Sequence, residues 1–158
     1  MSGFSGCPGS RTVSFDDPQT PEGGETARIS SQLRQWPIQL HLISPAAPYY
    51  RQADVLLAAD CVPFAMANFH GDFLKGKALA IACPKLDEGQ EVYVEKLRGW
   101  LDEAQIKSLT VLIMEVPCCR GLAQLAVQAW ERSGRKVPIR SVTVSLKGDV
   151  IQEDWLRI

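Results

Sequence analysis

Apolar and polar residues follow two different periods along this chain, and the periods predict strands and helices in turn. Short apolar runs predict strands, and stretches with apolar residues three and four positions apart predict helices between most of them. The expected strands cover residues 38–43, 54–59, 78–82, 109–115 and 139–146. The expected helices cover residues 64–74, residues 89–105, and the stretch from Cys119 to Gly134.

Each expected helix has an apolar face that predicts which side chains enter the core. Phe64, Ala67 and Leu74 share the apolar face of the first helix. The second and third helices have longer stripes, made of Val94, Leu97, Trp100, Leu101 and Ala104, and of Leu122, Leu125, Ala126 and Ala129. The charged residues between them are expected to face solvent.

Two further segments have weaker patterns. Ser30 or Ser31 can cap a short helical turn that Pro37 ends. Residues 147–149 predict a tight turn, after which the chain is expected to end as a short polar and aromatic tail.

Strands that alternate with helices indicate βαβ units, in which the strands run parallel and the helices cover the sheet. The expected fold is α/β, with three layers, a mostly parallel sheet of about five strands, and helices on both faces. Residues 31–158 are expected to form this single domain. Residues 1–30 are rich in Gly, Ser, Pro, Asp and Glu and are expected to be a flexible N-terminal arm that carries Cys7.

Composition excludes several classes of function. The net charge of -1 and the lack of a Lys/Arg cluster on one predicted face argue against a nucleic-acid partner. The longest apolar run is far shorter than a membrane span requires, and the N-terminus lacks the pattern of a secretory signal. We therefore expect a cytoplasmic protein. No glycine-rich nucleotide-binding motif follows a strand.

The cysteines are the main chemical clue. Cys61, Cys83 and the pair Cys118 and Cys119 each follow the carboxyl end of an expected strand. Parallel strands end at one edge of a sheet, so the fold is expected to gather these thiols at one rim. Prolines beside them, at Pro8, Pro63, Pro84 and Pro117, would stiffen the turns.

Several chemistries suit such a rim. Four thiolates can hold either an iron-sulfur cluster or a tetrahedral zinc ion, and Cys7 is a further candidate ligand. Cys118 and Cys119 could instead exchange thiols as a vicinal pair. The ordinary alternative is that the cysteines are small buried apolar residues. Cys119 is expected in the first turn of a helix, where the dipole would lower its pKa.

The neighbouring polar residues have ordinary explanations. Asp60 and Asp87 could orient ligands, although capping a helix is the more common role for an aspartate in such a place. His70 is expected to be a core or capping residue rather than a ligand, and His41 is expected to face solvent or an edge.

Four motifs in order resemble a known family. They are Cys7-Pro8-Gly9-Ser10-Arg11, residues 58–70, Cys83-Pro84-Lys85-Leu86-Asp87, and residues 114–121. Together they resemble the cysteine-containing domain of many anaerobic bacteria, which often follows a ferredoxin module in proteins described as iron-sulfur cluster-binding or ferredoxin-like oxidoreductases. The cysteine run of a ferredoxin itself is absent. Cys118-Cys119-Arg120-Gly121 is also similar to the Cys-Cys-Gly motif of heterodisulfide-reductase-type cluster domains, with Arg120 in place of a glycine.

The sequence and this resemblance lead to one hypothesis and one rival. The hypothesis is an iron-sulfur redox protein whose ligands come from Cys61, Cys83, Cys118 or Cys119, and Cys7, and which exchanges electrons with a ferredoxin-like carrier. The rival is a zinc-binding or thiol-based structural or interaction protein without a cluster. A role as a component of an oxidoreductase, and assembly into a homo-oligomer, both stay open.

Overall fold

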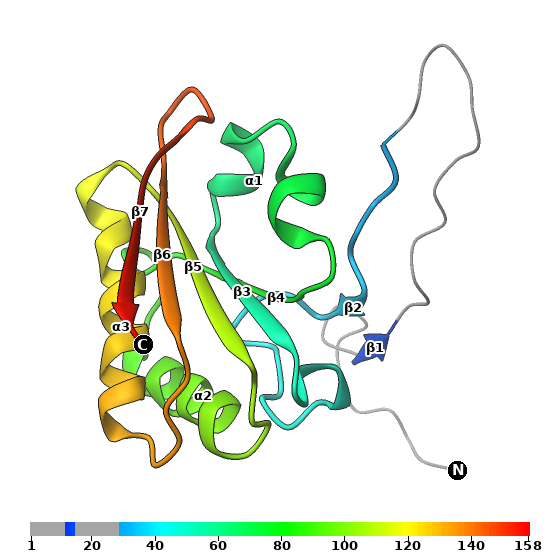
Figure 1. The fold of residues 1–158 in the computed structure, drawn as a ribbon, viewed down its shortest axis with the longest axis vertical. Coiled ribbons are helices and arrows are strands. Elements are labelled where there is room, and N and C mark those ends of the chain that lie inside the picture. Colours follow the sequence, from blue (N-terminus) through cyan, green and yellow to red (C-terminus); the bar gives the residue numbers. More distant parts are fainter. Residues whose placement is uncertain (1–11, 15–28) are drawn as a thin grey trace.

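The structure is a computed structural model that describes residues 12–14 and 29–158. Most of the predicted flexible arm, including Cys7, lies outside the described residues. The main sheet has five strands in the order β4-β3-β5-β6-β7 (Figure 1). They are β3 (Asp54–Ala59), β4 (Ala78–Ala82), β5 (Ser108–Met114), β6 (Ile139–Val144) and β7 (Val150–Arg157).

The first four of these strands are parallel to one another, and β7 alone is antiparallel, paired with β6. Their connections contain α1 (Val62–Ala65), the single π-turn η3 (His70–Leu74), α2 (Gln90–Asp102), the 3₁₀ turn η4 (Pro117–Cys119) and α3 (Arg120–Arg132). Another 3₁₀ turn, η2 (Pro48–Tyr50), precedes β3.

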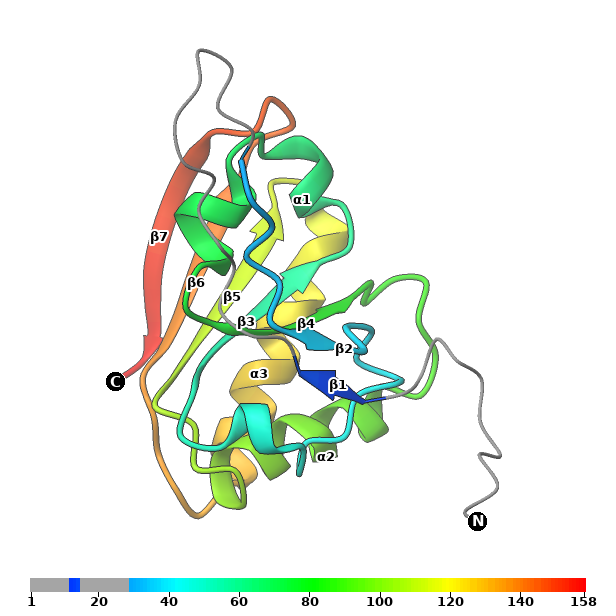
Figure 2. The same cartoon turned by 90° about the vertical axis from the view of Figure 1, so that its right-hand side faces the viewer.

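Helices cover both faces of the sheet because β4 and β5 lie on opposite sides of β3. A right-handed crossover from β3 to β4 therefore passes over one face, and the crossovers from β4 to β5 and from β5 to β6 pass over the other. The first carries α1 and η3, and the other two carry α2 and α3, which pack against each other (Figures 1 and 2). The expected three-layer α/β fold is confirmed.

Burial of the strands explains why they were recognisable from the sequence. All of β3 after Asp54, and all of β5 after Ser108, is buried, as continuous apolar runs in a parallel sheet require. The apolar stripes predicted for α2 and α3 are buried as well. No helix in the described part of the chain is long and apolar enough to cross a membrane.

The predicted strand at 38–43 is wrong. Only Gln39 forms a bridge there, parallel to Ile81 at the outer edge of β4. The chain then turns at once, since the amides of Leu42 and Ile43 both donate to the carbonyl of Gln39. Gln39 and His41, whose alternation with apolar residues suggested a strand, are part of this turn.

The predicted helical turn before Pro37 is also wrong. Gln35 and Trp36 form the short strand β2 (Gln35–Trp36), paired antiparallel with β1 (Val13–Ser14). A residue that precedes proline is biased toward extended backbone. The buried Gln35 amide bonds to both the N–H and the C=O of Leu79, which ties this segment to β4.

The single helix predicted over 64–74 is two short turns, α1 and η3, separated at Met66–Phe69. In the short helix α1 only Val62 is buried, and Phe64 is 93% exposed. Phe64 and Ala67 therefore do not share a buried face with Leu74. The C-terminal segment, expected to be a short tail, forms the whole of strand β7.

Gly148, in the β6–β7 turn, should be the least replaceable of the glycines with positive φ. Its φ is +91°, and a Cβ there would lie 2.2 Å from the carbonyl oxygen of Ala65. Gly148→Ala should lower the free energy of unfolding by about 3 kcal/mol or more, from backbone strain and overlap together. Urea denaturation measures this change.

Gly89→Ala is the matched control, because Gly89 has a φ of +73° and open space around it. It should cost only about 1 kcal/mol. Equal losses for the two variants would show that the turn does not pack against α1.

Candidate thiol site

The described cysteines lie at the carboxyl edge of three neighbouring strands. Cys61 follows β3, Cys83 follows β4, and Cys118 and Cys119 follow β5 within η4. In the register of the sheet, Ala59 is paired with Ala82, and Ala58 with Leu112. Since adjacent strands are about 4.8 Å apart, this edge spans about 10 Å from β4 to β5.

The strand order gives this edge its significance for ligand binding. The chain leaves β3 toward β4 on one side and later returns to β5 on the other, so the crossovers diverge between β3 and β5. Open α/β sheets bind ligands outside the carboxyl ends of their strands at such a point. Cys61 and the pair Cys118 and Cys119 flank it.

Burial divides the four thiols. Cys61 and Cys118 are exposed, Cys83 is half-buried and Cys119 is buried, and all four are free. Cys119 interacts electrostatically with Cys118 and Cys61 and through a side-chain hydrogen bond with Cys118. The thiols of β3 and β5 therefore belong to one group.

The expected low pKa of Cys119 is wrong, although its place at the start of α3 is as predicted. Burial is the largest influence and raises the pKa of the thiol, and the neighbouring Cys118 and Cys61 raise it further. The Cys119 amide donates to the carbonyl of Val116, so it is not free to stabilise a thiolate. Burial thus outweighs both the helix start and a backbone hydrogen bond at Met114 that lowers the pKa of Cys119.

The loop that carries Cys83 is held from two sides. The Asp87 carboxylate accepts the Cys83 amide at 2.9 Å and the hydroxyl of the buried Tyr93, on α2, at 2.5 Å. On the other side, Pro84 packs on Gly121 so closely that a Cβ on Gly121 would lie 3.1 Å from the Cβ of Pro84. This loop therefore joins β4 to both α2 and the start of α3.

Asp60 places an unsatisfied oxygen beside Cys61. Its Oδ1 is buried and has no hydrogen-bond partner in the described structure. Burial and the nearby Asp87 raise the pKa of the Asp60 carboxyl, in that order. A buried polar atom without a partner is unusual in a native fold, and it marks this part of the rim as a place that can accept a proton or another donor.

The capping role expected for the two aspartates is wrong. The helix after Cys61 has no side-chain cap, and α2, whose N-cap residue is Gly89, has none either. Asp87 bonds instead within its own loop and to Tyr93, as described above.

Both histidines make contacts away from the cysteines. The Nδ1 atom of His70 accepts the amide of Gln32 at 3.0 Å, which ties the N-terminal segment to η3. His41 is exposed and its ring lies 4.5 Å from that of Tyr93. Both observations fit the structural roles expected for them.

Zinc and an iron-sulfur cluster require different spacings between their ligands. Among residues 12–14 and 29–158, no three His, Cys, Asp or Glu side chains lie together as a site for a single metal ion. Tetrahedral zinc needs four donors about 2.3 Å from one point. An iron-sulfur cluster binds its thiolates at different iron atoms, so its ligands can be spread more widely.

Tyr93 was missed by sequence reasoning. Its hydroxyl bonds to Asp87, and burial, followed by that bond, raises the pKa of the phenol. The available signal was the position of Tyr93 beside Val94 in the predicted apolar stripe, six residues after Asp87. A tyrosine buried by its helix needs a partner for its hydroxyl, and Asp87 lies among the acidic residues just before this helix.

Comparison with known proteins agrees with the fold. The profile of a family described as "Rossmann-like domain" matches residues 47–158. An uncharacterized protein of Archaeoglobus fulgidus is 29% identical over 119 residues, which cover 75% of this chain and 83% of that protein. No solved structure matches this chain.

The different burial of the thiols predicts different reactivity in the reduced, metal-free protein. Cys118 and Cys61 should react with iodoacetamide several-fold faster than Cys119, because only exposed thiolates are attacked and burial raises the pKa of Cys119. Tandem mass spectrometry of timed samples measures each site. In urea the difference should vanish, and a fast Cys119 in the folded protein would contradict the described packing.

The Tyr93 hydroxyl should stabilise the Cys83 loop measurably. Tyr93→Phe removes a hydrogen bond to a carboxylate and should lower the free energy of unfolding by about 1.5–3 kcal/mol. A double-mutant cycle with Asp87→Ala isolates the pair. If Tyr93→Phe costs the same whether or not Asp87 is present, the bond does not hold the loop.

Proposed function

This chain belongs to the Rossmann-like domain family, and from that fold and its thiol-bearing rim we propose that it is an iron-sulfur cluster-binding redox protein. The observation that carries the proposal is the placement of Cys61, Cys83 and the Cys118–Cys119 pair at the ends of three adjacent strands. Its motifs also resemble the cysteine-containing domain of anaerobic iron-sulfur proteins.

In this proposal the ligands come from the four described cysteines, with Cys7, outside the described residues, as a further one. When bound, a cluster supplies one-electron transfer. The protein contributes placement: the Asp87 and Tyr93 bonds fix the backbone at Cys83, and Pro117 begins the turn that carries Cys118 and Cys119. Ligands held before binding lose less conformational freedom.

A surface position for the cluster suits exchange of electrons with another protein. Cys61 and Cys118 are exposed, so a group bound to them would lie near the molecular surface. The proposed partner is a ferredoxin-like electron carrier. The four free thiols also fit a reducing compartment, which supports the proposal of a cytoplasmic location.

The second candidate is a zinc-binding or thiol-based protein without a cluster. The interaction between Cys118 and Cys119 favours a thiol-based protein over a zinc protein. It brings an exposed thiol next to a buried one, as thiol exchange by a vicinal pair requires. A disulfide between adjacent cysteines is strained and therefore easily reduced.

Metal and sulfide analysis after anaerobic purification separates these functions. We expect iron and labile sulfide in the full chain, visible absorption that dithionite bleaches, and loss of most of the iron in Cys61→Ser and in Cys83→Ser. Cys118→Ser and Cys119→Ser, made singly, identify which of the two is a ligand. Transfer of electrons between the protein and a reduced ferredoxin tests the partner.

Two results would contradict the cluster. Zinc at about one ion per chain without labile sulfide would favour the structural zinc protein. Metal content unchanged in both Cys118→Ser and Cys119→Ser would favour thiol exchange. Thermal unfolding of each variant shows whether a lost metal reflects a lost ligand or a lost fold.

A further inference from the structure

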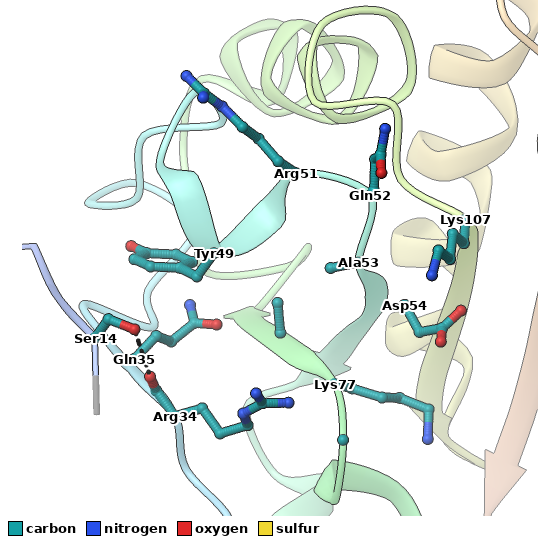
Figure 3. Close-up of a pocket in the computed structure, with 12 residues that line it drawn as sticks. Ser14, Arg34, Gln35, Tyr49, Arg51, Gln52, Ala53, Asp54, Lys77 and Lys107 are labelled. Carbon is teal, nitrogen blue, oxygen red and sulfur yellow. Dashed lines mark hydrogen bonds between the residues drawn. The ribbon is translucent and has the colours of Figure 1, made fainter. Parts of the chain in front are cut away.

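A second polar site lies at the opposite edge of the sheet. A cavity of about 370 Å³ opens at the amino ends of β3, β4 and β5, with Asp54, Ala78 and Lys107 in its wall (Figure 3). Because these strands are parallel, the thiol rim is at their other ends. The six residues of β3 separate the two by about 20 Å, so this cavity is independent of the proposed cluster.

The wall of the cavity is strongly cationic. It contains Arg34, Arg51, Lys77 and Lys107, against one carboxylate, that of Asp54. In Figure 3 the Arg51 side chain points away from the others, whereas Arg34, Lys77 and Lys107 extend from three different segments of the chain around the site. These three cations and the Asp54 carboxylate line the same cavity.

The charges of Lys77 and Lys107 are only partly compensated by the described residues. Asp54 accepts the hydroxyl of Ser108 at 2.6 Å. Lys77 donates to the carbonyl of Phe73 at 3.0 Å. Among the described residues, neither Lys77 nor Lys107 forms an ion pair.

Burial supports the same conclusion for Lys77. Removal from water, and then the nearby Arg140, lower the pKa of its ammonium group, and Asp54 offsets this only in part. A bound anion would reverse both effects, because it would solvate the charge and offset the repulsion.

We propose that this cavity binds a small molecule through a phosphoryl group, held by Lys77 and Lys107. The volume is at the lower end of the range for small-molecule sites, which suits a phosphate or diphosphate with a small attached part. A phosphoryl group presents several oxygens and close to two charges, so it can meet cations from separate directions, whereas a single carboxylate pairs with one. Arginine and lysine are the usual protein ligands of such groups.

Isothermal titration of the full chain with inorganic pyrophosphate tests this site. Binding should saturate at one site, weaken as NaCl is added, and be about tenfold weaker in Lys107→Gln, as expected when one charged hydrogen bond is lost. Lys107→Arg should retain binding within a few-fold. Lys107 is exposed, so its substitution leaves the core intact. Ribose 5-phosphate as a second probe distinguishes a phosphorylated metabolite from free inorganic phosphates, according to which binds more tightly.

Lys75→Gln is the matched control, since Lys75 is exposed, close in sequence to Lys77, and absent from the cavity wall. It should bind pyrophosphate as the unaltered protein does. Failure to saturate, or equal weakening in Lys75→Gln and Lys107→Gln, would overturn the site. Citrate binding as tightly as pyrophosphate would overturn its assignment to a phosphoryl group. None of these readouts depends on metal content, so they test this site independently of the proposed cluster.

Discussion

Parallel pairing of β3 with β4 on one side and with β5 on the other is the constraint on which the rest of this structure depends. The three strands are largely buried, so the backbone groups that face a neighbouring strand must pair with it. This pairing places all three carboxyl ends at one edge and all three amino ends at the other. The described thiols are at one of these two edges, and the cations of the cavity are at the other.

The two edges differ in the chemistry they carry. The carboxyl edge has four thiols and two aspartates, one of which has a buried oxygen without a partner. The amino edge has cations around a cavity. Since the strands keep the edges apart, a ligand at one edge would not contact the other, and any influence between them would have to pass through the sheet.

Contacts between loops far apart in sequence complete the carboxyl edge. Pro84 packs on Gly121, which joins the loop after β4 to the start of α3, and Gly148 packs on the carbonyl of Ala65, which joins the β6–β7 turn to α1. The contact at Gly148 needs a residue without a side chain, and the contact at Gly121 leaves little room for one. The bonds of Asp87 to Cys83 and Tyr93 add a polar anchor to the same region. The thiols are thus carried on short turns tied to neighbouring helices.

The sequence predicts most of the main sheet, namely the strands at 54–59, 78–82, 109–115 and 139–146. It also predicts the buried faces of α2 and α3 and the position of the cysteines at strand ends. These features depend on local periodicity and on continuous apolar runs, which are properties of neighbouring residues. The sequence predictions are wrong where a residue distant in sequence determines the local backbone conformation. Gln35 is extended because it bonds to Leu79, and the tail is a strand because β6 offers it an edge.

The sequence by itself therefore determined the α/β class, the helix faces and the thiols at strand ends, because burial of apolar side chains has a short-range signature. Only the tertiary structure decided which strands are neighbours, that Cys119 is buried with a raised pKa, that Tyr93 meets Asp87, and that lysines distant in sequence line one cavity. Desolvation and electrostatic interactions depend on distances in space, and those distances are set by how the chain crosses over the sheet.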